Sequence, residues 1–205
     1  METIGSSIVE CGVASRALPG EPSCGDLQVV KWLPNGVLVA VLDGIGHGPE
    51  AASAAAAARS ILEDHAQEPV IALIERCHRG LRGTRGVAMS LASFDGSQGL
   101  LTWMGVGNVQ GVLLRRGSAA AMEASLLLRG GVVGVQLPSL QAAFLLRVFP
   151  GDTLVFTTDG IRSDFARELA RHQPPQKAAE SILAHYGKSS DDAMVLVARY
   201  LRDCP

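Results

Sequence analysis

The chain has 205 residues, of which 47% are apolar and 19% charged, a composition that excludes an intrinsically disordered chain and allows a sizeable core. Its formal net charge of −2 argues against a general nucleic-acid binder, which needs a concentrated basic surface. It contains no apolar run of about 18 residues, and its N-terminus lacks the pattern of a secretory signal, so we expect a cytoplasmic protein with no membrane partner.

The first predicted elements are strands. Residues 3–15 are read as an extended strand and residues 17–26 as a loop. Two apolar, β-branched runs follow at 26–33 and 37–43, separated by the tripeptide Pro-Asn-Gly at 34–36. Since Asn and Gly tolerate positive φ in a tight turn, the pattern predicts a β-hairpin.

Two helices are predicted after this hairpin. Residues 44–66 change from a glycine-rich loop to strong helix formers, with Pro49 placed near a first helical turn. A second helix is predicted over residues 68–81.

The remaining chain is rich in strands. Strands are predicted at 87–95, 100–108, 109–116, 142–149, 153–160 and 193–201. A glycine-containing loop is expected beside a strand at 126–135. Two further helices are predicted at 163–172 and 175–187.

This order of elements indicates an α+β fold. A strand pair, a helical pair, a run of strands, a second helical pair and a closing strand favour layered packing. Short hairpin turns favour antiparallel pairing over repeated parallel crossovers. We therefore expect one domain over residues 1–205, built from two packed, mainly antiparallel sheets with a helical pair on each outer face.

Acidic residues lie where several predicted strands begin or end. Asp26 opens the second strand, Asp43 and Asp159 each end an apolar strand and precede glycine, and Asp191-Asp192 opens the last strand. Buried carboxylates lose hydration and repel one another unless positive charge compensates them. Divalent cations such as Mg²⁺ or Mn²⁺, which prefer oxygen ligands, would provide that charge.

A single Asp-Gly pair usually marks a surface turn, and we expect such a turn at Asp95-Gly96. The acidic residues near strand ends, taken together with the segments around them, resemble a known family. VLDGIGHGPEAASAA, TTDGI and DDAMVLVARY resemble the signature segments of metal-dependent type 2C protein phosphatases in their bacterial SpoIIE-like branch. CGD at 24–26 matches an early Gly-Asp motif of that branch. The resemblance covers nearly the whole chain and is nearest to RsbX-type stressosome phosphatases, through residues 74–91 and 105–109.

This resemblance implies a four-layer αββα sandwich with two Mn²⁺ or Mg²⁺ ions at one edge between the sheets. A water activated by the metals would hydrolyse phosphoserine or phosphothreonine on a protein. The substrate would be a phosphorylated signalling protein, namely a stressosome component with a STAS domain. The implied metal ligands are Asp26, Asp43, the carbonyl of Gly44, Asp159 and Asp191. Asp192 is expected to have a structural role.

The roles of several residues can be interpreted in two ways. His47, in DGIGHG, is interpreted as a proton donor or a residue that supports a ligand by hydrogen bonding, or as a loop residue that caps the next helix. Arg82 and Arg85 contact phosphate or an acidic partner, or are solvated loop residues. Trp32 and Trp103 are expected to be core or strand-packing residues and not a recognition platform.

The sequence also leaves alternative functions open. Met194 stands where the family commonly has a small hydroxyl residue, so the loop after Asp191 could be arranged differently. A non-catalytic binding module with this fold, or a phosphatase for small molecules, remains an alternative. The four widely spaced cysteines, Cys11, Cys24, Cys77 and Cys204, are interpreted as ordinary thiols because they form no CxxC pair.

Overall fold

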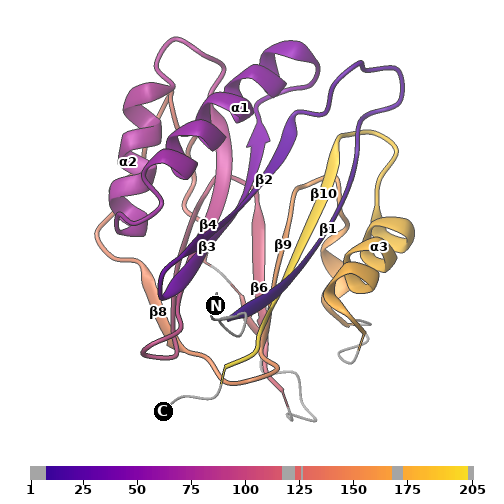
Figure 1. Cartoon of the computed structure of the whole chain (residues 1–205). Coiled ribbons are helices and arrows are strands. Elements are labelled where there is room, and N and C mark those ends of the chain that lie inside the picture. Colours follow the sequence, from indigo (N-terminus) through magenta and orange to yellow (C-terminus); the bar gives the residue numbers. More distant parts are fainter. Residues whose placement is uncertain (1–7, 117–122, 126, 168–172, 203–205) are drawn as a thin grey trace, which may run out of the picture.

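The computed structural model describes residues 8–116, 123–125, 127–167 and 173–202. It is an α+β structure in which two five-stranded sheets pack face to face and helices cover their outer faces (Figure 1). Every pair of neighbouring strands within the sheets is antiparallel, as predicted.

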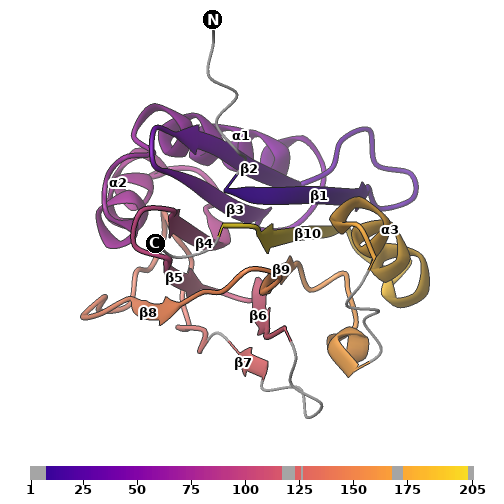
Figure 2. The ribbon, with the colours of Figure 1, turned by 60° about the horizontal axis from the view of Figure 1, so that its bottom comes forward.

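The first sheet contains, in spatial order, β1 (Val9–Arg16), β10 (Ala193–Tyr200), β9 (Thr153–Thr157), β6 (Gln110–Leu114) and β7 (Glu123–Ser125). The second contains β2 (Asp26–Leu33), β3 (Gly36–Gly44), β4 (Val87–Asp95), β5 (Leu100–Val106) and β8 (Phe144–Arg147). Strands β7 and β8 lie at the edge away from β1 and β2 (Figure 2).

In the described part of the chain, three α-helices cover the sheets. α1 (Pro49–Asp64) and α2 (Val70–Gly80) pack on the second sheet, and α3 (Pro175–Tyr186) packs on the first. Figure 1 shows the first two on one side of the molecule and α3 on the other. Among the helices of the described residues, none has the length and apolarity needed to cross a membrane.

Strand alternation explains why the chain has an apolar layer on each side of the second sheet. On β3, Val37, Val39 and Val41 face the core between the sheets. Leu38, Ala40 and Leu42 face α1 and α2. Successive side chains of a strand point to opposite faces, so a strand covered on both faces must be apolar throughout.

The predicted hairpin at 26–43 is confirmed, with Leu33 paired to Gly36 across the turn. The surface turn expected at Asp95-Gly96 is also confirmed, because the Asp95 carboxylate accepts hydrogen bonds from the main chain and hydroxyl of Ser97. Trp103 is 1% exposed and packs between the sheets, as expected. Trp32 is 50% exposed on the edge strand β2, so of the two expected positions, core or strand, it takes the one on a strand.

The predicted helical pair on the first sheet is also wrong in the described part of the chain. Ser163–Arg167 forms a short 3-10 helix instead of an α-helix, and residues 168–172 of the prediction lie outside the described residues. Ser163 and Asp164 favour turns and helix ends over helix interiors. Within this 3-10 helix, Phe165 is buried and packs in the apolar cluster between α3 and the first sheet. Among the described residues, the fourth layer therefore consists of α3 and one 3-10 turn.

Some strand boundaries also differ from the prediction. The first strand begins at Val9, and residues 1–7 lie outside the described part of the chain. The three-residue strand β7 was not predicted. Cys11, Cys24 and Cys77 are free thiols, and burial raises the pKa of each to about 12, consistent with unreactive side chains. Cys204 lies outside the described residues.

We expect Asp152→Ala to lower the free energy of unfolding by about 3 kcal/mol, because it would remove a buried ion pair and two main-chain contacts. Asp152 is 2% exposed, and its carboxylate accepts hydrogen bonds from Arg115 Nη1 and from the main-chain N–H groups of Arg116 and Phe149. Urea denaturation measures the change. The control Asp164→Ala, which breaks an exposed pair with Arg162, should change stability by less than about 0.5 kcal/mol. Equal losses of stability from the two variants would contradict the stabilising role of Asp152.

Candidate metal centre

Two of the expected ligands lie side by side on the second sheet. Asp26 and Asp43 are directly opposite each other in the antiparallel pair of β2 and β3. The N–H of Gly44 donates to the carbonyl of Gly25 at 3.1 Å, which closes the ladder beyond them. Cross-strand neighbours have Cβ atoms about 5 Å apart, so the two carboxylates leave the same end of the sheet together.

The other expected ligands come from the first sheet. Asp159 follows β9, and Asp191 precedes β10, which is the strand paired with β9. Thr158, the residue before Asp159, donates its hydroxyl to Asp26 Oδ2 at 2.8 Å. This bond joins the two sheets, so acidic segments far apart in the sequence meet at one edge of the sandwich.

The carboxyl groups of this edge have raised pKa values. Burial raises the pKa of Asp26 to about 8, with a further contribution from the negative charge of Asp43 and a partial offset from the Thr158 hydroxyl. Burial also raises the pKa of Asp43 to about 7, and the charges of Asp159 and Asp191 add to the rise. Burial, and then the charge of Asp159, raises the pKa of Asp191. The edge therefore has more negative charge than its protein surroundings compensate.

The residues fit an open magnesium or manganese centre. Within the described ranges, no three His, Cys, Asp or Glu side chains surround one point closely enough to form a complete cage of protein ligands. Mg²⁺ usually keeps several waters and takes only one or two carboxylates from the protein. This edge offers oxygen donors, partial exposure to solvent and excess negative charge, which suit such an ion. It does not offer the four closely placed nitrogen or sulfur ligands that a structural zinc ion needs.

The glycines after the two strand-ending aspartates are required by backbone packing. A Cβ at position 44 would lie 2.2 Å from the carbonyl oxygen of Ala51 in α1. A Cβ at position 160 would lie 1.9 Å from the carbonyl oxygen of Asp192. The missing Cβ at each position therefore makes room for another part of the chain and does not by itself indicate a metal.

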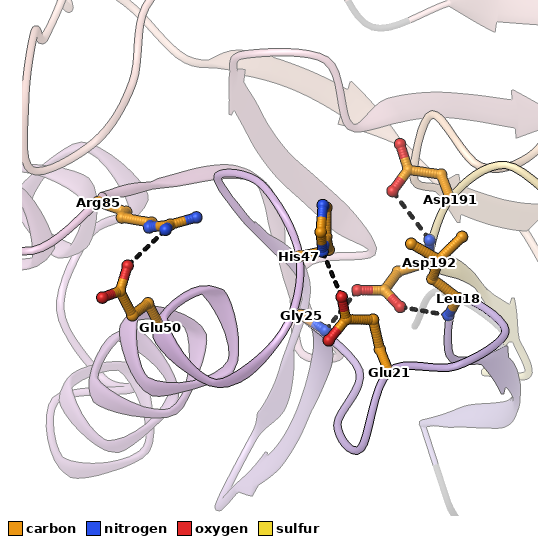
Figure 3. Close-up of polar contacts among 8 residues, drawn as sticks. All are labelled: Leu18, Glu21, Gly25, His47, Glu50, Arg85, Asp191 and Asp192. Carbon is orange, nitrogen blue, oxygen red and sulfur yellow. Dashed lines mark hydrogen bonds and ion pairs between the residues drawn. The ribbon is translucent and has the colours of Figure 1, made fainter.

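Asp191 and Asp192 have different surroundings. Asp192 is buried, and its two carboxylate oxygens accept the N–H groups of Leu18 and Gly25, each at 2.7 Å (Figure 3). Its own N–H donates to Asp191 Oδ1 at 2.9 Å. Because both oxygens of Asp192 already hold the loop between β1 and β2, the geometry favours Asp191 as the residue available to a cation.

His47 lies on the loop after β3 and is mainly exposed. Its Nδ1 lies 2.6 Å from Glu21 Oε1 (Figure 3). The N-cap of α1 is Gly48, and no described side chain caps that helix, so the capping interpretation of His47 is wrong. With Nδ1 engaged by Glu21, the other ring nitrogen, Nε2, remains for a second partner.

The two arginines of the 81–86 loop differ. Arg85 forms an ion pair with Glu50 at 2.5 Å, and its Nη1 would lie 2.7 Å from a Cβ on Gly46, so it lies against the loop after β3 (Figure 3). Arg82 is exposed. Arg85 is therefore the one of the two that is placed beside the candidate site.

Three contacting residues were not singled out from the sequence. Asn108 donates its side-chain amide to Asp159 Oδ2 at 2.7 Å, and its position after a glycine, in the segment 105–109, was the available signal. Thr158 could have been noticed as a hydroxyl next to Asp159. Glu21 lies in a loop without a distinguishing pattern. Met194 packs between the sheets and pairs with Ser15 of β1.

Comparison with known proteins gives a consistent result. A family model described as stage II sporulation protein E (SpoIIE) matches residues 34–201. The chain is 25% identical over 181 residues to phosphoserine phosphatase RsbX of Bacillus subtilis (strain 168), covering 88% of this chain and 89% of that protein.

Solved structures have the same fold. One chain, from work on the bacterial stressosome as a modular system adapted to control secondary messenger signaling, superposes with a TM-score of 0.82 at 32% identity. The match covers 93% of this chain and 99% of that one. A crystal structure of RsbX in complex with magnesium also gives a TM-score of 0.82, at 24% identity, covering 94% of this chain and 95% of that one.

Proposed function

This chain belongs to the SpoIIE family of PP2C-type serine/threonine phosphatases, and from that membership we propose that it removes phosphate from a phosphorylated signalling protein with the help of two divalent cations. The observation that carries the proposal is the meeting of acidic segments from both sheets at one edge, where burial and mutual repulsion raise the pKa values of Asp26 and Asp43. In this proposal, residues 1–205 act as one catalytic domain in the cytoplasm.

The proposed ligands have distinct roles. Asp43 would contact both cations, a role supported by its pairing with Asp26 on its own sheet and by the effect of the Asp159 charge on its pKa. Asp159 and Asp191 would hold the second cation, and the carbonyl of Gly44 and Asp26 would complete the ligand set. Two Mg²⁺ or Mn²⁺ ions bound there would lower the pKa of a water and neutralise charge on the phosphoryl oxygens.

The substrate proposal rests on the relatives. RsbX is named a phosphoserine phosphatase, and a structure at 32% identity comes from work on the bacterial stressosome. We infer that the substrate is a phosphorylated stressosome component with a STAS domain. The site supports an ester on a protein, because its edge is open to solvent at His47 and Asn108 and can admit a phosphorylated loop.

The test is a phosphatase assay of the purified chain with Mn²⁺, with Mg²⁺ and with excess chelator. We expect hydrolysis of a phosphoserine-containing STAS-domain protein that requires added metal and is much faster than hydrolysis of free phosphoserine. Equal rates on the two substrates would indicate a small-molecule phosphatase. Lack of turnover on either substrate and on an aryl phosphate would indicate a binding module instead.

We propose that His47 donates the proton to the leaving serine or threonine oxygen. Its Nδ1 is held by Glu21, which orients the ring, so Nε2 would carry the transferred proton. His47→Ala should lower kcat by about 100-fold on the phosphoprotein and remove the loss of kcat that a required acid causes at alkaline pH. Steady-state kinetics between pH 6 and pH 9, about the range in which the fold should be stable, measures both effects.

An activated substrate provides the control for His47. An aryl phosphate has a leaving group that needs little protonation, so His47→Ala should change its hydrolysis much less. An unchanged pH profile on the phosphoprotein, or equal losses on both substrates, would contradict the proton-donor role.

A further inference from the structure

A buried hydroxyl connects the two sheets beneath the acidic edge. Thr158 is 1% exposed and lies between β9 and Asp159. Its Oγ1 accepts the main-chain N–H of Met194 at 2.9 Å and donates to Asp26 Oδ2 at 2.8 Å. Met194 belongs to β10 in the first sheet, whereas Asp26 begins β2 in the second.

The direction of this chain of hydrogen bonds follows from the donor inventory. A main-chain N–H can only donate, so Thr158 Oγ1 accepts from Met194. A hydroxyl has a single hydrogen, and an ionised carboxylate can only accept, so that hydrogen points to Asp26. With Asp26 ionised, as a cation ligand must be, the order is therefore Met194 N–H to Thr158 O–H to Asp26 Oδ2.

This arrangement fixes the direction of one carboxylate. Once Oδ2 of Asp26 is held from the opposite sheet, the plane of the carboxylate and the position of Oδ1 are constrained. Metal sites depend on such outer hydrogen bonds, and losing one typically weakens metal affinity by about 10–100-fold.

We propose that Thr158 is a positioning residue, whose hydroxyl aims the Asp26 carboxylate at the cation site from across the sheet boundary and thereby sets the affinity for divalent metal. This inference rests on the proposed function, because it requires that Asp26 serve the metal centre. Thr158 itself touches neither metal nor substrate in this proposal. Its effect passes through Asp26.

The neighbouring residue provides an unusually close control. Thr157 is also buried in the same segment, but its Oγ1 finds no hydrogen-bond partner among the described residues. Adjacent residues in a strand point to opposite faces, so Thr157 points away from the inter-sheet core that Thr158 faces. Replacement of either threonine by valine removes one buried hydroxyl at nearly constant volume.

The experiment measures Mn²⁺ binding directly, by electron paramagnetic resonance of free Mn²⁺ during titration of the purified chain without substrate. Thr158→Val is expected to raise the Kd for Mn²⁺ by about 10–100-fold, whereas Thr158→Ser should remain close to wild type because it keeps the hydroxyl. Thr157→Val should leave the Kd unchanged, and its melting temperature should be equal or higher because an unpaired hydroxyl is removed. If Thr158→Val does not fold, Thr158→Ala replaces it.

A double-mutant cycle separates positioning from general structural damage. In an Asp26→Ala background, Thr158→Val should cause no further loss of Mn²⁺ affinity, because the residue through which it acts is gone. Additive losses, an unchanged Kd in Thr158→Val, or equal losses in Thr158→Val and Thr158→Ser would overturn the inference. Absence of Mn²⁺ binding by the wild-type chain would instead overturn the proposed function, and this is measured first.

Discussion

Asp43→Asn is expected to lower metal-dependent phosphatase activity by on the order of 1,000-fold while the fold survives. Asparagine has nearly the same shape as aspartate but lacks the negative charge that attracts cations. Asp43 is paired with Asp26 in the second sheet and is affected by the charge of Asp159 from the first, so in the proposed site its charge would act on both cations. Steady-state kinetics over a range of Mn²⁺ concentrations measures the loss, and circular dichroism checks the fold.

The same dipeptide elsewhere in the chain supplies the control. Asp95-Gly96 lies at the opposite end of β4 from Ala88, the residue paired with Asp43. Asp95 Oδ1 accepts from Ser97 and Gln98, and an asparagine oxygen can accept the same bonds. Asp95→Asn should therefore keep wild-type activity. Wild-type rates from Asp43→Asn at saturating Mn²⁺ would remove the basis of the metal assignment.

Gly160→Ala is expected to disrupt both stability and metal binding. The added Cβ would lie 1.9 Å from the carbonyl oxygen of Asp192, a contact with rigid backbone that cannot be relieved by a side-chain rotation. The φ of Gly160 is not positive, so the effect comes from contact and not from backbone strain. We expect a loss of about 3 kcal/mol in the free energy of unfolding. Affinity for Mn²⁺ should fall because Asp191 and Asp159 would move apart.

Urea denaturation and Mn²⁺ titration calorimetry measure the two effects of Gly160→Ala. The control is Gly130→Ala, since Gly130 has no described neighbour within 4 Å of the added carbon and its φ is also not positive. Gly130→Ala should leave Mn²⁺ affinity unchanged and stability within about 0.5 kcal/mol of wild type. A Gly160→Ala protein that matched this control would show that the Asp192 carbonyl can move without consequence.

The sequence predicted those parts of the structure that local patterns determine. The hairpin at 26–43 followed from a turn tripeptide between two β-branched runs, and the strand ending at Asp43 followed from its continuous apolar pattern. The acidic set could be recognised because each member follows or precedes a strand. In the described part of the helix predicted at 163–172, Ser163–Arg167 forms a 3-10 helix instead, because Ser163 and Asp164 favour turns and helix ends.

Non-local contacts could not be predicted. The bond from Thr158 to Asp26 joins residues 132 positions apart, and that from Asn108 to Asp159 joins residues 51 positions apart. Nothing in the local sequence of either donor specifies its acceptor. The exposure of Trp32 could not be predicted for the same reason, because edge or centre position in a sheet depends on strand order, which the local pattern does not contain.

The last strand of the chain is the one that completes the first sheet. β10 lies between β1 and β9 and is paired with both, and Asp191 lies two residues before it. While the chain is being synthesised, β1 has no partner in that sheet until β10 has left the ribosome. If translation stops before Asp191, the nascent chain lacks both the strand that joins β1 to the first sheet and one of the proposed cation ligands. We therefore expect the proposed cation site to form late in synthesis, after the second sheet has been made.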